Sequence, residues 1–467
     1  MPELGTADHP LRVAIVGAGP AGFYVAEHLA KRADLTVAID LFERLPTPYG
    51  LVRFGVAPDH EKIKNVTRVY DRVAGGSHFR FFGNVDVGRD VTLDDLRRFY
   101  HQICFTTGAQ TDRRMGIPGE DLDRSHAATE FVAWYNGHPD YRDRTFDLSV
   151  ERVAVVGVGN VAVDVARILC RTPEELATTD IADYALDALR RSRVREVYML
   201  GRRGPAQAAF TNPEVRELGA MPGADVVVEP DEVALDALSR AELEREPDRS
   251  TEKKIEIIQG FAQQQPSGKP KKLIIRFLVS PLEILDDGDG RVAAMRIVKN
   301  RLRAAENGSL RPEATEMTED LPVQLVFRSV GYRGVSLDGL PFEERRGTVP
   351  NVQGRVIDPA TETPVPGVYV SGWIKRGPSG VIGTNKPDAG ETVGAMLEDL
   401  DRGATLSPEA PGGDAVERFV RERRPACVSY DDWKRLDALE AGRGKPQGRP
   451  RVKFTSVEEM LEALRRT

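Results

Sequence analysis

Two glycine-rich turns in this sequence have the spacing of dinucleotide-binding loops. The first, residues 17–22, follows an apolar run at 12–16 and precedes a helix-compatible stretch at 23–32. In such a loop Gly17 permits a tight turn, Gly19 lets a pyrophosphate approach the backbone, and Gly22 lets the helix pack closely on the strand. The helix N-terminus offers N–H groups and a partial positive charge to phosphates. The first turn therefore predicts a dinucleotide site.

The second turn, residues 157–162, repeats this plan after an apolar run at 152–156 and before a helix at 163–170. Gly157 and Gly159 could simply connect strand and helix. However, Ala162 stands at the third position, where NADP sites often carry alanine. A second dinucleotide site is expected here.

The residues that follow the next strand of each unit differ in charge. Glu43 ends the run at 35–42, where an acid can bind a ribose hydroxyl. After the run at 196–200 come Arg202 and Arg203, and no acid stands there. An arginine pair could be a solvated surface, but at this position it favours bidentate contact with a 2′-phosphate. The sequence thus favours NADPH over NADH.

A late segment, residues 372–385, places Trp373 and several glycines ahead of a helix. Glycines permit close approach to a flat ring, and the helix N-terminus could stabilise negative charge on a reduced flavin. The alternative is a surface turn with Trp373 in the core. Two dinucleotide sites fit FAD at the first turn and NADP(H) at the second, so that hydride passes from nicotinamide to flavin.

These elements predict an α/β fold with two Rossmann-type dinucleotide-binding domains of the three-layer ββα type. We expect the NADP domain, residues 113–324, to be inserted into a discontinuous FAD domain, residues 1–112 and 325–467. Chain crossings are expected at 111–124 and near 331–333. The middle region, with β-like runs at 273–278 and 292–298, is interpreted as an antiparallel addition to the second unit.

Composition removes several classes of function. The 467 residues carry a formal charge of −7, which gives no bulk reason to expect nucleic-acid binding. Cys104, Cys170 and Cys427 are too scattered for dithiol chemistry, an iron–sulfur cluster or a metal site, so no metal is expected. No run is long enough to span a membrane, and the start at Met1–Leu4 lacks signal-peptide regions, so a cytoplasmic protein is expected.

Three longer segments are more specific than a glycine loop. Residues 45–60, 201–211 and 372–386 resemble motifs of adrenodoxin reductase and its bacterial ferredoxin–NADP reductase relatives, and the resemblance extends from about 12 to 400. It implies a glutathione-reductase-type flavoprotein that passes single electrons from NADPH, through FAD, to a ferredoxin-type iron–sulfur protein. Such partners feed a cytochrome P450 or another oxygenase.

The resemblance also implies individual residue roles. Besides the glycines of the first turn, it implies FAD contacts from Ala21, Glu43, Leu51, Val87, Trp373, Gly380, Val381 and Ile382. It implies NADP contacts from Gly159, Asn160, Val161, Arg202, Arg203, Glu214 and Gly380. His60 and Glu214 are implied to lie near the reacting rings and to affect hydride transfer, although from the residues alone His60 could be structural and Glu214 a surface carboxylate.

The partner is expected to bind transiently, and the chain to be a monomer or weak dimer. Because such partners are usually acidic, a local basic face is needed, for which the candidates are Lys31, Arg32, Arg190, Arg191, Arg193 and Arg195. The strand at 101–106 departs from the family, because His101 and Gln102 are unusual in a buried strand. That departure puts local packing near the FAD site in doubt.

Three alternatives stand beside this interpretation. A disulfide reductase would need a cysteine pair beside the flavin, and a glutamate-synthase-like NADPH-oxidising subunit would need cluster cysteines; neither is present. The third is a non-catalytic FAD/NADP-binding protein that senses redox state or acts as a scaffold.

Overall fold

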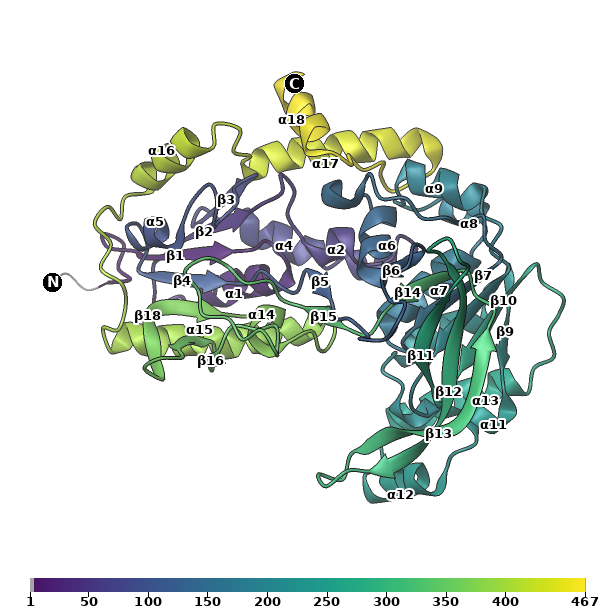
Figure 1. Ribbon diagram of the computed structural model, residues 1–467. Helices are drawn as coiled ribbons and strands as arrows, with labels where there is room; N and C mark the ends of the chain where they lie inside the picture. The colour runs from purple at the N-terminus through teal and green to yellow at the C-terminus, as the bar shows by residue number, and fades with distance from the viewer. Residues whose placement is uncertain (1–3, 467) are drawn as a thin grey trace. The chain divides into compact units, whose positions relative to one another are not determined.

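The computed structural model describes residues 4–466, so most of the start segment Met1–Leu4 lies outside the described residues. The chain forms two compact units: residues 1–56, 60–111 and 331–467 in the first, and residues 57–59 and 112–330 in the second. Each contains its own largely parallel sheet flanked by helices (Figure 1). Within residues 4–466, no helix combines the length and the apolar character needed to cross a membrane.

The first unit is built on a seven-stranded sheet of order β16-β17-β18-β4-β1-β2-β3. Its strands are β1 (Leu11–Val16), β2 (Val37–Glu43), β3 (Phe79–Gly83), β4 (Gln102–Phe105), β16 (Asn351–Val352), β17 (Arg355–Asp358) and β18 (Thr363–Val370). The strands from β3 to β18 run parallel. Because β1 pairs with β2 on one side and β4 on the other, the chain order reverses at β1, and the carboxyl end of β1 is where such sheets bind ligands.

The helices of the first unit come from both ends of the chain, and those after residue 372 complete it (Figure 1). They are α1 (Pro20–Ala30), α2 (Leu51–Phe54), α3 (Glu61–Lys64), α4 (Thr67–Ala74), α5 (Leu93–Arg97), α14 (Trp373–Arg376), α15 (Asn385–Asp401), α16 (Gly413–Arg423), α17 (Tyr430–Gly444) and α18 (Val457–Arg466). Two 3₁₀ turns, η3 (Ile382–Thr384) and η4 (Lys445–Gln447), accompany them.

The second unit has a six-stranded sheet of order β6-β14-β7-β8-β10-β9 and a three-stranded antiparallel sheet β11-β12-β13. The strands are β6 (Ser125–Ala127), β7 (Arg152–Val156), β8 (Glu196–Leu200), β9 (Ala224–Val228), β10 (Lys271–Arg276), β11 (Val279–Asp286), β12 (Val292–Ala304), β13 (Leu310–Leu321) and β14 (Leu325–Arg328). The helices are α6 (Ala128–Tyr135), α7 (Asn160–Cys170), α8 (Pro173–Leu176), α9 (Asp183–Arg190), α10 (Asn212–Gly219), α11 (Pro230–Val233), α12 (Ala237–Arg245) and α13 (Arg249–Ala262), with 3₁₀ turns η1 (Pro139–Tyr141) and η2 (Pro205–Gln207). Two short strands, β5 (Thr111–Asp112) and β15 (Tyr332–Arg333), pair with each other in a two-stranded sheet.

Two expectations about the second unit need correction. The run at 273–278 is not part of the antiparallel addition, because β10 pairs in parallel with β8 and β9 of the main sheet. The boundary at 324/325 also comes too early. β14 pairs in parallel with β7 and β6, so the chain leaves the second unit only after residue 330.

His101, which precedes β4, and Gln102, its first residue, each have a hydrogen-bond partner. Gln102 is buried and its side-chain amide donates to the carbonyl of Met396 at 2.6 Å. The Nδ1 of His101 accepts the Arg12 N–H at 3.0 Å, and burial, with Arg12 adding to it, lowers the pKa of His101 to about 4. A neutral ring is required of an acceptor, so the two observations agree. Within residues 4–466 both side chains thus have a hydrogen-bond partner, whereas the buried carbonyl oxygen of the Gln102 side chain has none.

Candidate functional site

The first glycine turn is held closed by its own backbone and by Thr106. Gly17 has φ +108°, and a Cβ on it would lie 2.8 Å from the Thr106 carbonyl. A Cβ on Gly22 would lie 2.2 Å from the Gly17 carbonyl, while the Thr106 hydroxyl donates to that carbonyl at 2.7 Å. Side chains are thus excluded at both positions. Thr106, the residue after β4, was not singled out from the sequence, since nothing local reveals this pairing.

Gly19 differs from its neighbours because it faces open space. A Cβ there would meet no atom within 4 Å, and its φ of −82° suits any residue. Gly19 is the N-cap of α1, and no side chain caps the helix. The helix N-terminus therefore offers N–H groups to a pyrophosphate lying over Gly19. The geometry fits the dinucleotide site expected from the sequence.

Glu43 lies at the carboxyl end of β2, beside this turn. Its carboxylate accepts the N–H of Ala18 at 3.0 Å and that of Leu45 at 3.1 Å. Burial raises the pKa of Glu43, while the two N–H donors act in the opposite direction. A carboxylate fixed here is suited to accept from ribose hydroxyls.

The late segment meets the first turn. A Cβ on Gly372 would lie 2.6 Å from the Cβ of Ala21, and Gly372, Gly377 and Gly380 all have φ between +79° and +85°. Trp373 donates from its indole to the Ser379 carbonyl at 3.1 Å. The segment is pinned by Asp388 of α15, whose carboxylate accepts the Gly372 N–H at 2.6 Å. Asp388 is a second residue that sequence reasoning missed.

Two of the apolar residues implied to contact FAD have exposed side chains. Leu51 is 37% exposed and Val381 51% exposed, although both are large hydrophobic side chains. Ile382 packs partly against the core, and Val87 is buried. Isolated exposed apolar groups are ordinary on a protein surface. Beside two glycine-rich segments, they fit a site that takes a flat aromatic ring system.

The second glycine turn repeats the geometry of the first. Gly157 has φ +136°, and a Cβ on it would lie 2.3 Å from the Ser329 carbonyl. Gly159 is the N-cap of α7 without a side-chain cap, has φ −105°, and again faces open space. The Asn160 side chain accepts the Thr211 N–H at 2.9 Å, and Val161 packs against the core. This turn fits a second pyrophosphate.

Arg202 and Arg203 follow β8. Within residues 4–466 neither forms an ion pair, although the charge of Glu242 acts on Arg203, and the Arg203 guanidinium reaches only the Gln207 carbonyl, at 3.4 Å. Burial, and then the charge of Arg202, lower the pKa of Arg203. Two like charges held side by side favour an anion between them. A 2′-phosphate has the charge and geometry for this place.

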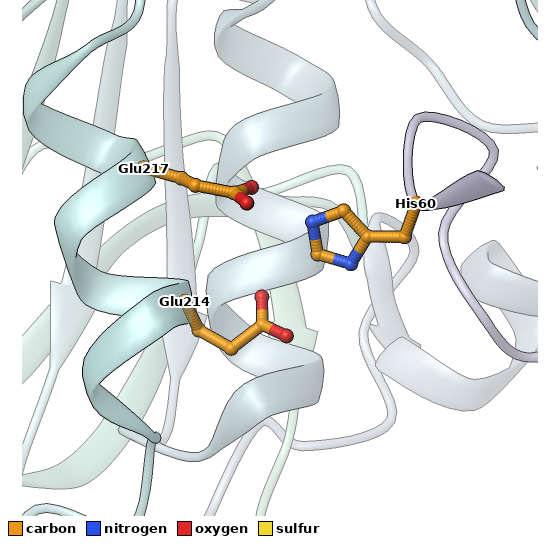
Figure 2. Close-up of side chains that lie close together, drawn as sticks. All are labelled: His60, Glu214 and Glu217. Carbon is orange, nitrogen blue, oxygen red and sulfur yellow. The ribbon is translucent and has the colours of Figure 1, made fainter. Parts of the chain in front are cut away.

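Glu214 and Glu217 lie on successive turns of α10, with their side chains on the same side of the helix (Figure 2). Arg167 of α7 is fully buried and its guanidinium reaches Glu214 at 3.4 Å. It also binds the carboxylate of Asp59 at 2.8 and 3.1 Å, and Arg171 binds the same carboxylate at 2.6 Å. Asp59 thus belongs to the second unit, and His60, on the loop before α3, is the next residue of the chain (Figure 2).

Comparison with known proteins decides the family. NADPH-ferredoxin reductase FprA of Mycobacterium tuberculosis (strain ATCC 25618 / H37Rv) is 45% identical over 461 residues, covering 97% of this chain and 98% of that protein. Human mitochondrial NADPH:adrenodoxin oxidoreductase is 41% identical over 472 residues, which cover 99% of this chain and 94% of that protein. This chain belongs to the adrenodoxin reductase-like family of ferredoxin–NADP reductases. The expected resemblance is confirmed.

The fold of this reductase is confirmed as well. The solved structure of Mycobacterium tuberculosis FprA in complex with NADPH superposes with a TM-score of 0.92 at 44% identity, covering 98% of this chain and all of that one. A family profile described as pyridine nucleotide-disulphide oxidoreductase matches residues 11–202. Its match begins at β1 and ends at Arg202.

The buried arginine of this reductase leads to a stability prediction. Replacing Arg167 with Met should lower the free energy of unfolding by about 3–5 kcal/mol, because the carboxylates of Asp59 and Asp164 lose their buried counter-charge. Arg167 itself stays protonated. Burial lowers its pKa, but Asp164, Asp59 and Glu214 together raise the pKa above its usual range. Urea unfolding measures the change. The control is Arg190→Ala, which breaks an exposed pair with Asp187 and should cost less than about 1 kcal/mol; equal losses would contradict the account.

Proposed function

We propose that this chain is an FAD-containing, NADPH-oxidising reductase that delivers electrons one at a time to a ferredoxin-type iron–sulfur protein. The observation that carries the proposal is the presence of two glycine turns with open space over Gly19 and Gly159, in a chain related over its whole length to ferredoxin reductases. One NADPH gives up a hydride, and two oxidised ferredoxins each gain one electron; NADP⁺ and a proton are released. FAD, when bound, supplies the conversion between the two-electron and the one-electron steps.

The residues of the first unit hold the flavin nucleotide in this proposal. The N–H groups at the start of α1 face the pyrophosphate over Gly19, and Glu43 accepts from the ribose. Leu51, Trp373, Val381 and Ile382 surround the ring and exclude water. Ala21, Val87, Gly17, Gly22 and Gly380 shape the space. The open approach to Gly19, the glycine backbone at 372–380 and the exposed Leu51 and Val381 support these roles.

The residues of the second unit hold NADPH. The start of α7, with Gly159, Asn160 and Val161, faces its pyrophosphate, and Arg202 with Arg203 takes the 2′-phosphate. We propose positioning or proton-transfer roles for Glu214 of this unit and for His60, which belongs to the first unit. The buried Arg167 supports the role of Glu214, because its guanidinium contacts that carboxylate at 3.4 Å.

The competing functions lose support. The thiols of Cys104, Cys170 and Cys427 are buried and unpaired, and burial raises the pKa of Cys170 and of Cys427 to about 12 each. Such thiols are poor nucleophiles at neutral pH, so disulfide reduction is disfavoured. A redox sensor or scaffold would not need the full-length relationship to enzymes of this family.

Three of the six candidate residues for the basic face form ion pairs within the chain. Lys31, Arg32 and Arg190 form ion pairs with Glu27, Asp34 and Asp187. Arg193 and Arg195 precede β8, whereas Arg202 follows it, so they lie at the opposite end of a strand roughly 16 Å long. Four expectations stay predictions: that the complex is transient, that the partner passes electrons to a cytochrome P450 or other oxygenase, that the protein is cytoplasmic, and that it is a monomer or weak dimer.

The test is an anaerobic titration of the purified protein with NADPH. We expect a flavin absorption band that NADPH bleaches and NADH bleaches far less readily. Absence of a flavin band would contradict the proposal and favour the non-catalytic alternative, as would a band that NADPH leaves unchanged.

A further inference from the structure

Within the first unit, the C-terminal segment, from α17 onward, packs against the loop at Tyr49 and Gly50 and the short helix α2 that begins at Leu51. Leu51 is 37% exposed, but the next three residues of α2, Val52, Arg53 and Phe54, are each no more than 5% exposed. The segment from α17 onward supplies the side chains that bury Arg53. The loop is thus held from one side and presents Leu51 on the other.

This loop also abuts the first glycine turn. The Tyr49 N–H donates to the Ala18 carbonyl at 2.7 Å, and a Cβ on Gly50 would lie 3.1 Å from the Cα of Gly19. Tyr49 has φ +84°, a left-handed conformation that a bulky residue adopts only when its surroundings impose it. A displacement of the loop would therefore shift Ala18 and Gly19, over which we propose the flavin pyrophosphate to lie.

The side chain of Tyr49 shows what imposes this conformation. Its hydroxyl donates to Asp71 at 2.7 Å and lies 3.0 Å from the hydroxyl of Tyr430, and the Trp433 indole donates to it at 3.3 Å. Tyr430 and Trp433 both belong to α17. The strained turn is therefore anchored by α17 as well as by α4.

A buried ion pair provides the second anchor. The Arg53 guanidinium binds the Glu440 carboxylate in bidentate fashion at 2.9 and 2.5 Å, and Glu440 is fully buried. The guanidinium also lies over the Trp433 ring, 5.1 Å from its centre. The Lys453 ammonium donates to the Arg53 carbonyl at 3.2 Å, and the Phe454 N–H donates to Glu440 at 2.8 Å. A bidentate pair fixes both position and orientation, which a neutral contact does not.

We propose that Glu440 is a positioning residue for the flavin. Through Arg53, and together with Tyr430 and Trp433, it holds the strained turn at Tyr49 and Gly50 and so sets the place of Leu51 and of the first glycine turn. Such residues act on a bound group without touching it. The inference rests on the proposed function, because it requires that FAD occupy the first unit.

The test measures the flavin directly. Glu440→Gln keeps the shape of the side chain and removes its charge. We expect flavin dissociation, followed by fluorescence after dilution, to accelerate by about tenfold, and the shape of the visible flavin band to change. KM for NADPH should stay unchanged, because the second glycine turn lies in the other unit. Arg53→Lys, which keeps a charge but loses the bidentate geometry, should fall between the wild type and Glu440→Gln.

Two further variants separate positioning from general stability. Asp399→Asn weakens another bidentate pair of the first unit, with Arg355 at 2.8 Å, at the far end of α15; it should lower the melting temperature without changing flavin release. Tyr430→Phe removes one hydroxyl from the Tyr49 cluster and is the milder variant if Glu440→Gln fails to fold. It should accelerate release in the same direction, by a smaller factor.

The outcomes are distinguishable. If the folded Glu440→Gln or Tyr430→Phe protein releases flavin at the wild-type rate with an unchanged spectrum, Glu440 is merely structural and the inference is overturned. If Asp399→Asn accelerates release equally, the inference is also overturned. If the wild-type protein holds no flavin, the proposed function itself fails.

Discussion

A Gly19→Val protein is expected to fold and to be purified without flavin. A Cβ at this position would meet no atom within 4 Å, and the backbone φ of −82° is ordinary for valine, so we expect the fold to tolerate the substitution. The added methyl groups would occupy the space over the start of α1 that we assign to the FAD pyrophosphate. We expect flavin affinity to fall at least about 100-fold. Absorbance of the purified protein and its circular dichroism measure the two effects.

The matched variant is Gly159→Val. Gly159 has the same N-cap place at α7, the same extended backbone and the same open surroundings, so its substitution is equally harmless to the fold. This protein should retain its flavin but lose reduction by NADPH. Together the two variants assign one cofactor to each unit. Loss of flavin in Gly159→Val, or its retention in Gly19→Val, would reverse or refute that assignment.

Replacing Arg202 and Arg203 with Ala should lower kcat/KM for NADPH strongly and leave kcat/KM for NADH unimpaired. Hydrogen bonds to charged groups contribute roughly 1.5–3 kcal/mol each, so losing both should lower kcat/KM for NADPH at least about 100-fold. NADH lacks the 2′-phosphate and should react as before, or slightly better. Steady-state reduction of ferricyanide with each nucleotide measures the change and needs no protein partner.

The control for the Arg202/Arg203 double variant changes the net charge by the same amount. Arg193→Ala with Arg195→Ala removes two exposed arginines from the other end of β8. It should leave kcat/KM for NADPH within about twofold. An equal loss with NADPH and NADH in the Arg202/Arg203 variant would remove the 2′-phosphate assignment, and an equal loss in the control would reduce the effect to general electrostatics.

Much of the fold follows from local sequence. The turns at Gly17 and Gly157 were predictable because a strand, a tight turn and a helix are specified within about 20 residues. β7 and β8 were predicted to the residue. β10 was misassigned because its apolar run is compatible with either sheet, and only its pairing with β8 and β9 decides. The boundary at 324/325 was wrong for the same reason: β14 pairs with β7, far earlier in the chain.

The supports of the candidate site were not predictable. Thr106 and Glu440 act through partners distant in the sequence, and nothing in their neighbourhoods marks them. Asp59 stands in the motif at 45–60, but its partner Arg167 is 108 residues away. Asp388 follows the motif at 372–386, which does not reveal its bond to the Gly372 N–H. Gln102 looked out of place in a buried strand because its acceptor, the Met396 carbonyl, is nearly 300 residues away. Residues that would touch a cofactor follow from motif chemistry. Those that hold them in place follow only from the folded structure.

The most direct test of the central claim is cytochrome c reduction driven by NADPH, with and without an added ferredoxin. Cytochrome c accepts single electrons, so its reduction reports the one-electron output proposed for this chain. We predict slow reduction by the protein alone and a rate that rises with ferredoxin concentration to saturation. A rate that NADPH supports equally well without ferredoxin would contradict the claim that an iron–sulfur protein is the acceptor.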